Sequence, residues 1–144
     1  MTPWLYLISI RMFIQAENLR VLQLAERFSD GMWPLVKTWD RFHQDTLGKQ
    51  LVRAVDSIGA NIAEGFGRHH PQDTLRFYYI ARGSLEETGY WLKRAESRCL
   101  VSKEKTWILM KELDLLSKTL NAFISAQKNR NRTASESLAN HPII

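Results

Sequence analysis

The sequence predicts an all-α protein with an antiparallel up-down-up-down four-helix bundle. Four stretches place apolar residues at alternating intervals of three and four, which is the spacing of one helix face. Their links are short, so consecutive helices must run in opposite directions. The stretch 50–65 carries an apolar and a polar face side by side, as expected for a helix with neighbours on several sides. A chain of 144 residues is long enough to form one such domain with a real core.

The chain divides into three regions: an apolar extension (1–14), the bundle (15–127) and a tail (128–144). The extension is too short to span a bilayer and is interrupted by Arg11. It has neither the basic leader nor the cleavage site of a signal peptide. Two interpretations fit: a packed extension or mis-assigned start, and an interfacial anchor or segment that docks on a neighbouring subunit. The tail keeps no apolar period, which predicts disorder.

The first helix is expected from about Glu17 to Trp39. Gly31 and Pro34 lie inside its pattern, and a proline removes one backbone donor, so a kink or break is expected near Asp30. Its core-facing residues are Leu22, Ala25, Phe28, Met32, Leu35 and Trp39.

The second helix is expected to begin after a connection that contains Phe42 and His43, with Asp45 or Thr46 as its cap. It ends near 65–68. Its apolar stripe comprises Leu51, Val55, Ile58 and Ile62. Beside it runs a polar stripe of Arg53, Ser57, Asn61 and Glu64.

The third helix starts at Pro71, a residue suited to the first helical position. Its core seam is predicted to contain Tyr78, Ala81, Leu85, Thr88, Leu92, Ala95 and Cys99. Cys99 would then be a buried, inert thiol. Ser102 caps the fourth helix, whose seam runs through Leu109, Leu113, Leu116, Leu120 and Phe123 or Ile124.

Polar residues of the second and third helices come level if the two helices are antiparallel about a turn near residue 70. Arg53 would face Glu86 or Glu87, Ser57 would face Gly83, and Glu64 would face Arg76. Gly83 would allow Ser57 or Asn61 to approach its backbone. The candidate polar network consists of Arg53, Ser57, Asn61, Glu64, Arg82 and Glu87. It is interpreted either as a hydrogen-bonded network that fixes helix register or as an active site inside the bundle.

Metal and phosphate motifs give little support to catalysis. The sequence has neither Glu-x-x-His nor His-Glu-x-x-His. Gly65-Phe66-Gly67 ends a helix, which favours a helix stop over a phosphate loop. His69 and His70 supply only two possible ligands where a metal site needs three or four. The sequence therefore predicts a non-catalytic protein with no metal and no cofactor.

Two motifs resemble one protein family. Residues 50–65 read Q-L-x-R-A-x-x-S-I-x-x-N-I-A-E-G, and Ala81-Arg82-Gly83-Ser84-x-x-Glu87 follows. Together they resemble the four-helix-bundle family of the bacterial large-subunit rRNA intervening-sequence protein, over roughly residues 18–127. This family is similar to the accessory variability determinant of diversity-generating retroelements. The resemblance implies a ring-like homopentamer, a kink in the first helix rather than a break, and, in the retroelement relatives, a reverse transcriptase with its RNA as partner.

Basic residues are predicted to gather at the end of the bundle that holds the first and third links, although Asp40, Asp45, Glu96 and Glu104 dilute them. The net charge of +5 is modest. This end is therefore interpreted either as a solvated mixed-charge surface or as a site for nucleic-acid phosphates. The candidate nucleic-acid-binding residues are Arg41, Lys49, Lys93, Arg94, Arg98, Lys103 and Lys105, with Arg53 beside them.

Assembly and function follow from these features. Five Trp, six Phe and four Tyr exceed what one small bundle buries easily, which favours a subunit contact. The single cysteine fits a cytoplasmic protein, and no membrane partner is expected. The leading function is an oligomeric bundle that binds RNA, DNA or a nucleic-acid enzyme. The alternative is a protein-interaction scaffold with no nucleic-acid role.

Overall fold

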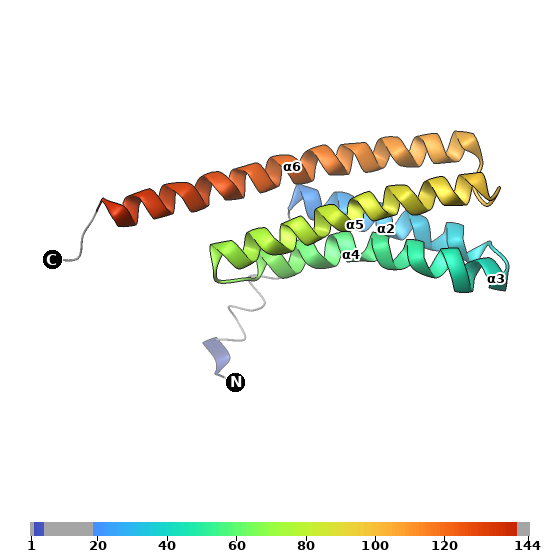
Figure 1. The fold of residues 1–144 in the computed structure, drawn as a ribbon. Helices are drawn as coiled ribbons and strands as arrows, with labels where there is room; N and C mark the ends of the chain where they lie inside the picture. The colour runs from blue at the N-terminus through green and yellow to red at the C-terminus, as the bar shows by residue number, and fades with distance from the viewer. Residues whose placement is uncertain (1, 5–18, 141–144) are drawn as a thin grey trace.

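Four long helices pack against one another in the computed structural model, which describes residues 2–4 and 19–140 (Figure 1). Consecutive helices run in opposite directions, joined by short links at alternate ends. Helix α4 packs on α2 and α5, and α6 packs on α5 and α2, so the core lies between all four. The all-α prediction is confirmed. The helices are α2 (Arg20–Lys37), α4 (Lys49–Phe66), α5 (Pro71–Ser97) and α6 (Lys103–Ala139).

The core consists largely of the predicted seams. Every apolar residue expected on the stripe of α4 is at most 1% exposed, and Tyr78, Leu92 and Leu120 are buried equally well. Helix α2 continues through Pro34 without a break. Of its expected core residues, Leu35 is only half-buried. Most of the apolar extension 1–14, and Glu17 at the expected start of the first helix, lie outside the described residues.

The entry to α4 differs from the prediction. Asp40, rather than Asp45 or Thr46, caps the helical turn α3 (Arg41–His43), because its carboxylate accepts a hydrogen bond from the His43 backbone N–H at 3.0 Å. The chain then passes through a π-helical turn, η1 (Gln44–Gly48), into α4. Phe42 and His43, expected in a loop, are therefore helical.

At the α5–α6 link, the predicted cap at Ser102 is confirmed, and the predicted burial of Cys99 is wrong. Ser102 caps α6 by accepting a hydrogen bond from the Lys105 backbone N–H at 3.1 Å. Helix α5, however, ends at Ser97, and Cys99 follows it with a φ of 59° and an exposed side chain. The left-handed conformation that reverses the chain after a helix places Cys99 outside the core.

Helix α6 extends well beyond the other three helices (Figure 1). Disorder was expected from residue 128, yet the helix continues to Ala139. This segment contains neither glycine nor proline. Hydrogen bonds between residues four apart support it, such as Gln127 to Asn131 at 2.8 Å. Local propensity therefore maintains the helix where the apolar period has ended.

The close helix approach occurs at Gly65 and not at Gly83. A Cβ atom on Gly65 would lie 2.8 Å from Tyr78 Cε1 and 2.9 Å from Phe77 Cβ, whereas one on Gly83 would meet nothing within 4 Å. The glycine that ends the first family-like motif thus allows α5 to pack tightly on α4. Gly83 faces outward and plays no such part.

Candidate nucleic-acid interface

The predicted basic residues do gather at one end of the bundle, here called the link end. Turn α3 and the α5–α6 link 98–102 lie together there (Figure 1). The link-end cations are Arg41 in α3, Lys49 at the start of α4, Lys93 and Arg94 near the end of α5, Arg98 in the link, and Lys103 and Lys105 in the first turn of α6. All are exposed except Arg94, which is half-buried.

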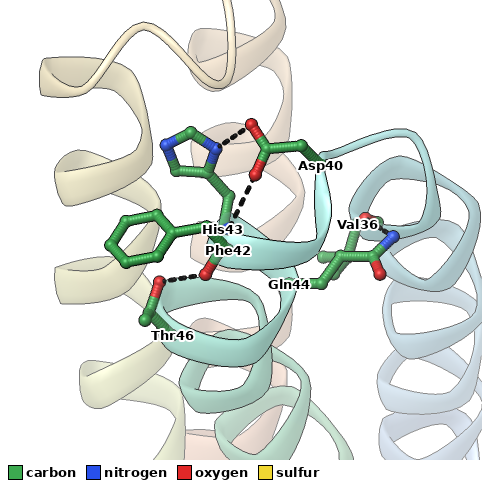
Figure 2. Close-up of polar contacts among 6 residues, drawn as sticks. All are labelled: Val36, Asp40, Phe42, His43, Gln44 and Thr46. Carbon is green, nitrogen blue, oxygen red and sulfur yellow. Dashed lines mark hydrogen bonds and ion pairs between the residues drawn. The ribbon is translucent and has the colours of Figure 1, made fainter.

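Asp40 organises the turn at this end (Figure 2). Its second carboxylate oxygen lies 2.8 Å from His43 Nδ1. The hydrogen bond from the His43 backbone lowers the pKa of Asp40, and the His43 side chain acts in the same direction. Gln44 donates to the carbonyl oxygen of Lys37 at 3.1 Å, which ties the turn to the end of α2. Phe42 points outward and is 71% exposed.

Most link-end cations have no acidic partner. Arg41 pairs with Asp45 at 3.5 Å. Within the described part of the chain, Lys49, Lys93, Arg98, Lys103 and Lys105 form no ion pair within 4.0 Å. Two of the acids expected to dilute this surface are engaged, Asp45 with Arg41 and Asp40 with His43. The other two, Glu96 and Glu104, form no ion pair among the described residues, so the five unpaired cations exceed the unpaired acids and leave a net positive charge for an external anion.

Arg94 and Trp39 differ from the other link-end residues. The Arg94 guanidinium lies 5.7 Å from the centre of the Tyr90 ring. Its Nε atom and the Trp39 Nε1 atom are buried without a hydrogen-bond partner. Arg94 is therefore partly engaged with the bundle itself, and it presents its charge less freely than its neighbours do.

The candidate polar network is divided in the structure. Ser84 donates to the Ser57 hydroxyl at 3.0 Å, and Asn61 donates to the same oxygen at 2.9 Å. These three short side chains join α4 to α5 near the predicted register, since Ser84 is one residue from the expected Gly83. They form the part that fixes how α4 and α5 are aligned.

The longer side chains of the candidate network turn outward. Glu64 pairs with Arg68 at 2.7 Å instead of Arg76. Arg82 lies over the Tyr79 ring at 5.0 Å, and Glu87 accepts from Trp91 Nε1 at 3.0 Å. Arg53 is exposed, with no ion pair to Glu86 or Glu87. No convergent set of acid, base and nucleophile results from this arrangement.

A second basic surface lies at the other end, around the α4–α5 turn and the start of the α6 overhang. Its cations lie on aromatic rings: Arg68 is 4.6 Å and Arg76 5.8 Å from the centre of Phe77, and Lys128 is 5.5 Å from that of Tyr79. Cations interleaved with aromatic rings are typical of nucleic-acid-binding surfaces. The run of three aromatic residues, 77–79, between Arg76 and Arg82 was the available sequence signal.

Metal and membrane sites find no support in the described residues. No group of three or more His, Cys, Asp or Glu residues in this part of the chain could hold a metal ion. None of the helices described is both long and apolar enough to cross a membrane. Gly67 follows the end of α4, with a right-handed φ of −81°.

The fold and surface define a class of protein: a four-helix bundle with a largely unpaired basic surface at one end and a serine–serine hydrogen bond between α4 and α5. The model of the 23S rRNA-intervening sequence protein family matches residues 17–122, and the chain belongs to this family. The bundle is also similar to a crystal structure from the S23 ribosomal protein family of Bacteroides thetaiotaomicron, a protein described as of unknown function. The TM-score is 0.65 at 25% identity, over 72% of this chain and 97% of the other. No curated protein matches significantly.

Proposed function

We propose that this protein is a non-catalytic, oligomeric bundle that binds nucleic acid through its link end. The observation that carries the proposal is the set of five cations there without an ion-pair partner among the described residues: Lys49, Lys93, Arg98, Lys103 and Lys105. Such side chains contact phosphates without reading sequence. Shape or a bound enzyme would then supply specificity, and the resemblance to the retroelement accessory protein suggests a reverse transcriptase as one such enzyme.

Assembly would raise the affinity of the link end for nucleic acid. A single link end offers few phosphate contacts, but a ring of identical copies repeats them at fixed spacing, so binding gains through avidity. Exposed apolar residues support an assembly: Trp33 is 57%, Trp107 60% and Leu115 49% exposed. Ile108 and Leu115 are two turns apart and share one face of α6. The resemblance implies that the ring is a homopentamer.

The same apolar face supports the second candidate, a protein-interaction scaffold. Trp107 is 60% exposed, and Lys111 lies over its ring with Nζ 3.8 Å from the ring centre. An exposed aromatic residue with a cation beside it is a common anchor in protein interfaces. Under this alternative the link-end cations are simply solvated.

The test compares two double variants by the salt dependence of their binding to a short structured RNA, measured by fluorescence anisotropy. Arg98→Gln with Lys103→Gln removes two link-end charges. Arg27→Gln with Lys118→Gln removes two exposed charges from the middle of α2 and α6. The slope of log K against log salt is negative. We expect the first variant to reduce its magnitude by about 1 to 2, and the second to leave it unchanged.

Equal slopes for both variants would exclude the link end as the binding surface. Light scattering with and without the RNA then separates the two candidates. A pentamer whose mass increases with RNA at low salt, and decreases again at high salt, supports nucleic-acid binding. A pentamer indifferent to RNA supports the scaffold, and a stable monomer contradicts the assembly that both require.

A further inference from the structure

A pocket of about 480 Å³ lies at the opposite end of the molecule, between the α4–α5 turn and α6. Its apolar wall contains Phe66 and Phe123, and its polar side contains Arg68, Tyr78 and Arg130. A volume of this size is within the range of sites for small organic ligands. Aromatic walls beside two guanidinium groups fit a ligand with a flat ring and an anionic group.

Arg130 is held at this pocket by a relay of amides. Its Nη2 atom donates to Gln127 Oε1 at 2.8 Å, Gln127 Nε2 donates to Asn131 Oδ1 at 2.8 Å, and Asn131 Nδ2 donates to the carbonyl oxygen of Pro71 at 3.2 Å. The relay fastens the α6 overhang to the first residue of α5. It uses one nitrogen of the guanidinium, Nη2, and Arg130 has no carboxylate partner within the described residues. Its charge is therefore fixed in place and not neutralised.

Tyr78 contributes a buried hydroxyl to the same pocket. The residue is only 1% exposed, and its ring packs 4.8 Å from that of Phe123. Gly65 makes this position possible, since any side chain there would collide with the Tyr78 ring. Burial raises the pKa of Tyr78 to about 12, and the positive charge of Arg130 acts in the opposite direction. The hydroxyl thus remains a hydrogen-bond donor at neutral pH.

The start of α5 adds no free backbone donor to this pocket. Its first-turn residues that line the pocket are Pro71, which has no N–H, and Thr74, whose N–H donates to the His70 carbonyl oxygen at 3.0 Å. Arg68 also lines the pocket but is partly neutralised by Glu64 at 2.7 Å. Asp73 lies in the first turn as well and lines the adjacent hollow with Glu64, not this pocket. Arg130 therefore supplies the main unpaired charge.

We propose that this pocket binds the phosphate group of a nucleotide, either a free mononucleotide or the 5′-terminal nucleotide of an RNA strand. Arg130, the Tyr78 hydroxyl and the part of Arg68 that Glu64 leaves free bind the phosphate, while Phe66 and Phe123 contact the base or ribose. Several converging donors suit the three terminal oxygens of a phosphate monoester better than a single carboxylate. The pocket is at the far end from the link-end cations, so this inference goes beyond the proposed function and can fail independently of it.

The test uses the full-length chain at low, constant salt. Calorimetry compares adenosine 5′-monophosphate with adenosine, and anisotropy compares a short single-stranded RNA carrying a 5′-phosphate with the same RNA carrying a 5′-hydroxyl. We expect the phosphate to tighten binding about ten-fold in at least one pair. Discrimination in both pairs indicates a mononucleotide site, and discrimination in the RNA pair alone indicates a site for strand ends.

Matched variants assign the effect to the pocket. Arg130→Gln, an exposed position on the overhang, should reduce the phosphate preference to less than about two-fold. Arg98→Gln, which removes one charge at the link end, should leave the preference intact. A circular dichroism melt confirms that both variants fold. The proposal is overturned if phosphate brings no preference in either pair, or if Arg130→Gln retains it.

Discussion

Replacing Gly65 with Ala tests the packing that the shared motif specifies. The added Cβ would lie 2.8 Å from Tyr78 Cε1 and 2.9 Å from Phe77 Cβ, and the latter atom cannot move without the α5 backbone. Overpacking costs about 1–3 kcal/mol, and three atoms within 2.9 Å of the added Cβ place Gly65 in the upper half of that range, at about 2–3 kcal/mol. The better helix propensity of Ala offsets at most about 1 kcal/mol. We therefore expect a net loss of about 1–2 kcal/mol in the free energy of unfolding.

Gly83→Ala is the matched control, because the same substitution in the same bundle meets nothing within 4 Å. Helix propensity alone then predicts a gain of about 0.5–1 kcal/mol. Both variants and the parent are unfolded in urea at one protein concentration, followed by circular dichroism at 222 nm as is usual for helices. The reasoning is refuted if Gly65→Ala is as stable as the parent, or if both variants shift in the same direction.

Two further predictions concern the link end. Asp40→Ala should destabilise the protein through loss of the α3 cap. The folded state lowers the pKa of Asp40 below 3.8. The difference in the free energy of unfolding between the variant and the parent should therefore be full above about pH 4 and shrink as the pH falls through the lowered pKa. A difference that stays constant across acid denaturation curves would contradict this. Cys99→Gly should stabilise the protein by about 1 kcal/mol in the same urea assay, since φ is 59° at Cys99. The native parent should react fully with a thiol reagent, and a protected thiol would show that Cys99 is not exposed.

The helical seams could be predicted because burial follows a simple period. Leu51, Val55, Ile58 and Ile62 fall on one face by spacing alone, and all four are buried. The cap at Ser102 and the position of Pro71 depend on local chemistry and were equally accessible. Such features are determined by residues close in sequence, so no tertiary information is needed to find them.

The predictions failed where tertiary contacts or backbone details decide. Spacing placed Arg53 and Glu64 beside Ser57, but it does not report side-chain length, and the longer side chains extend to solvent. Spacing placed Cys99 on the core seam of α5, yet the helix ends at Ser97. The π-helical turn before α4 is stabilised by packing and carries no apolar signature. Its Gly48 leaves room for Val36, since an added Cβ would lie 2.8 Å from Val36 Cγ1.

The candidate nucleotide pocket was missed because its residues belong to three segments with different sequence signals. Tyr78 looked like a core residue, and Arg68 like part of a turn. Arg130 lay in a stretch expected to be disordered. Only the continuation of α6 to Ala139 and the amide relay to Pro71 bring the three together. A basic, polar segment without apolar period gives no indication that it will be held against a folded surface.

The family match includes the link end of the bundle but not the α6 overhang. The match covers residues 17–122 and so includes Gly65, Tyr78 and every link-end cation. Arg130 and its supporting amides lie beyond it, and the similar S23-family structure is covered over 97% of its length by only 72% of this chain. The proposed link-end binding therefore rests on residues within the family match. The proposed nucleotide binding at the opposite end requires the overhang as well, so we expect a relative that ends with the bundle to lack it even where Gly65 and Tyr78 are present.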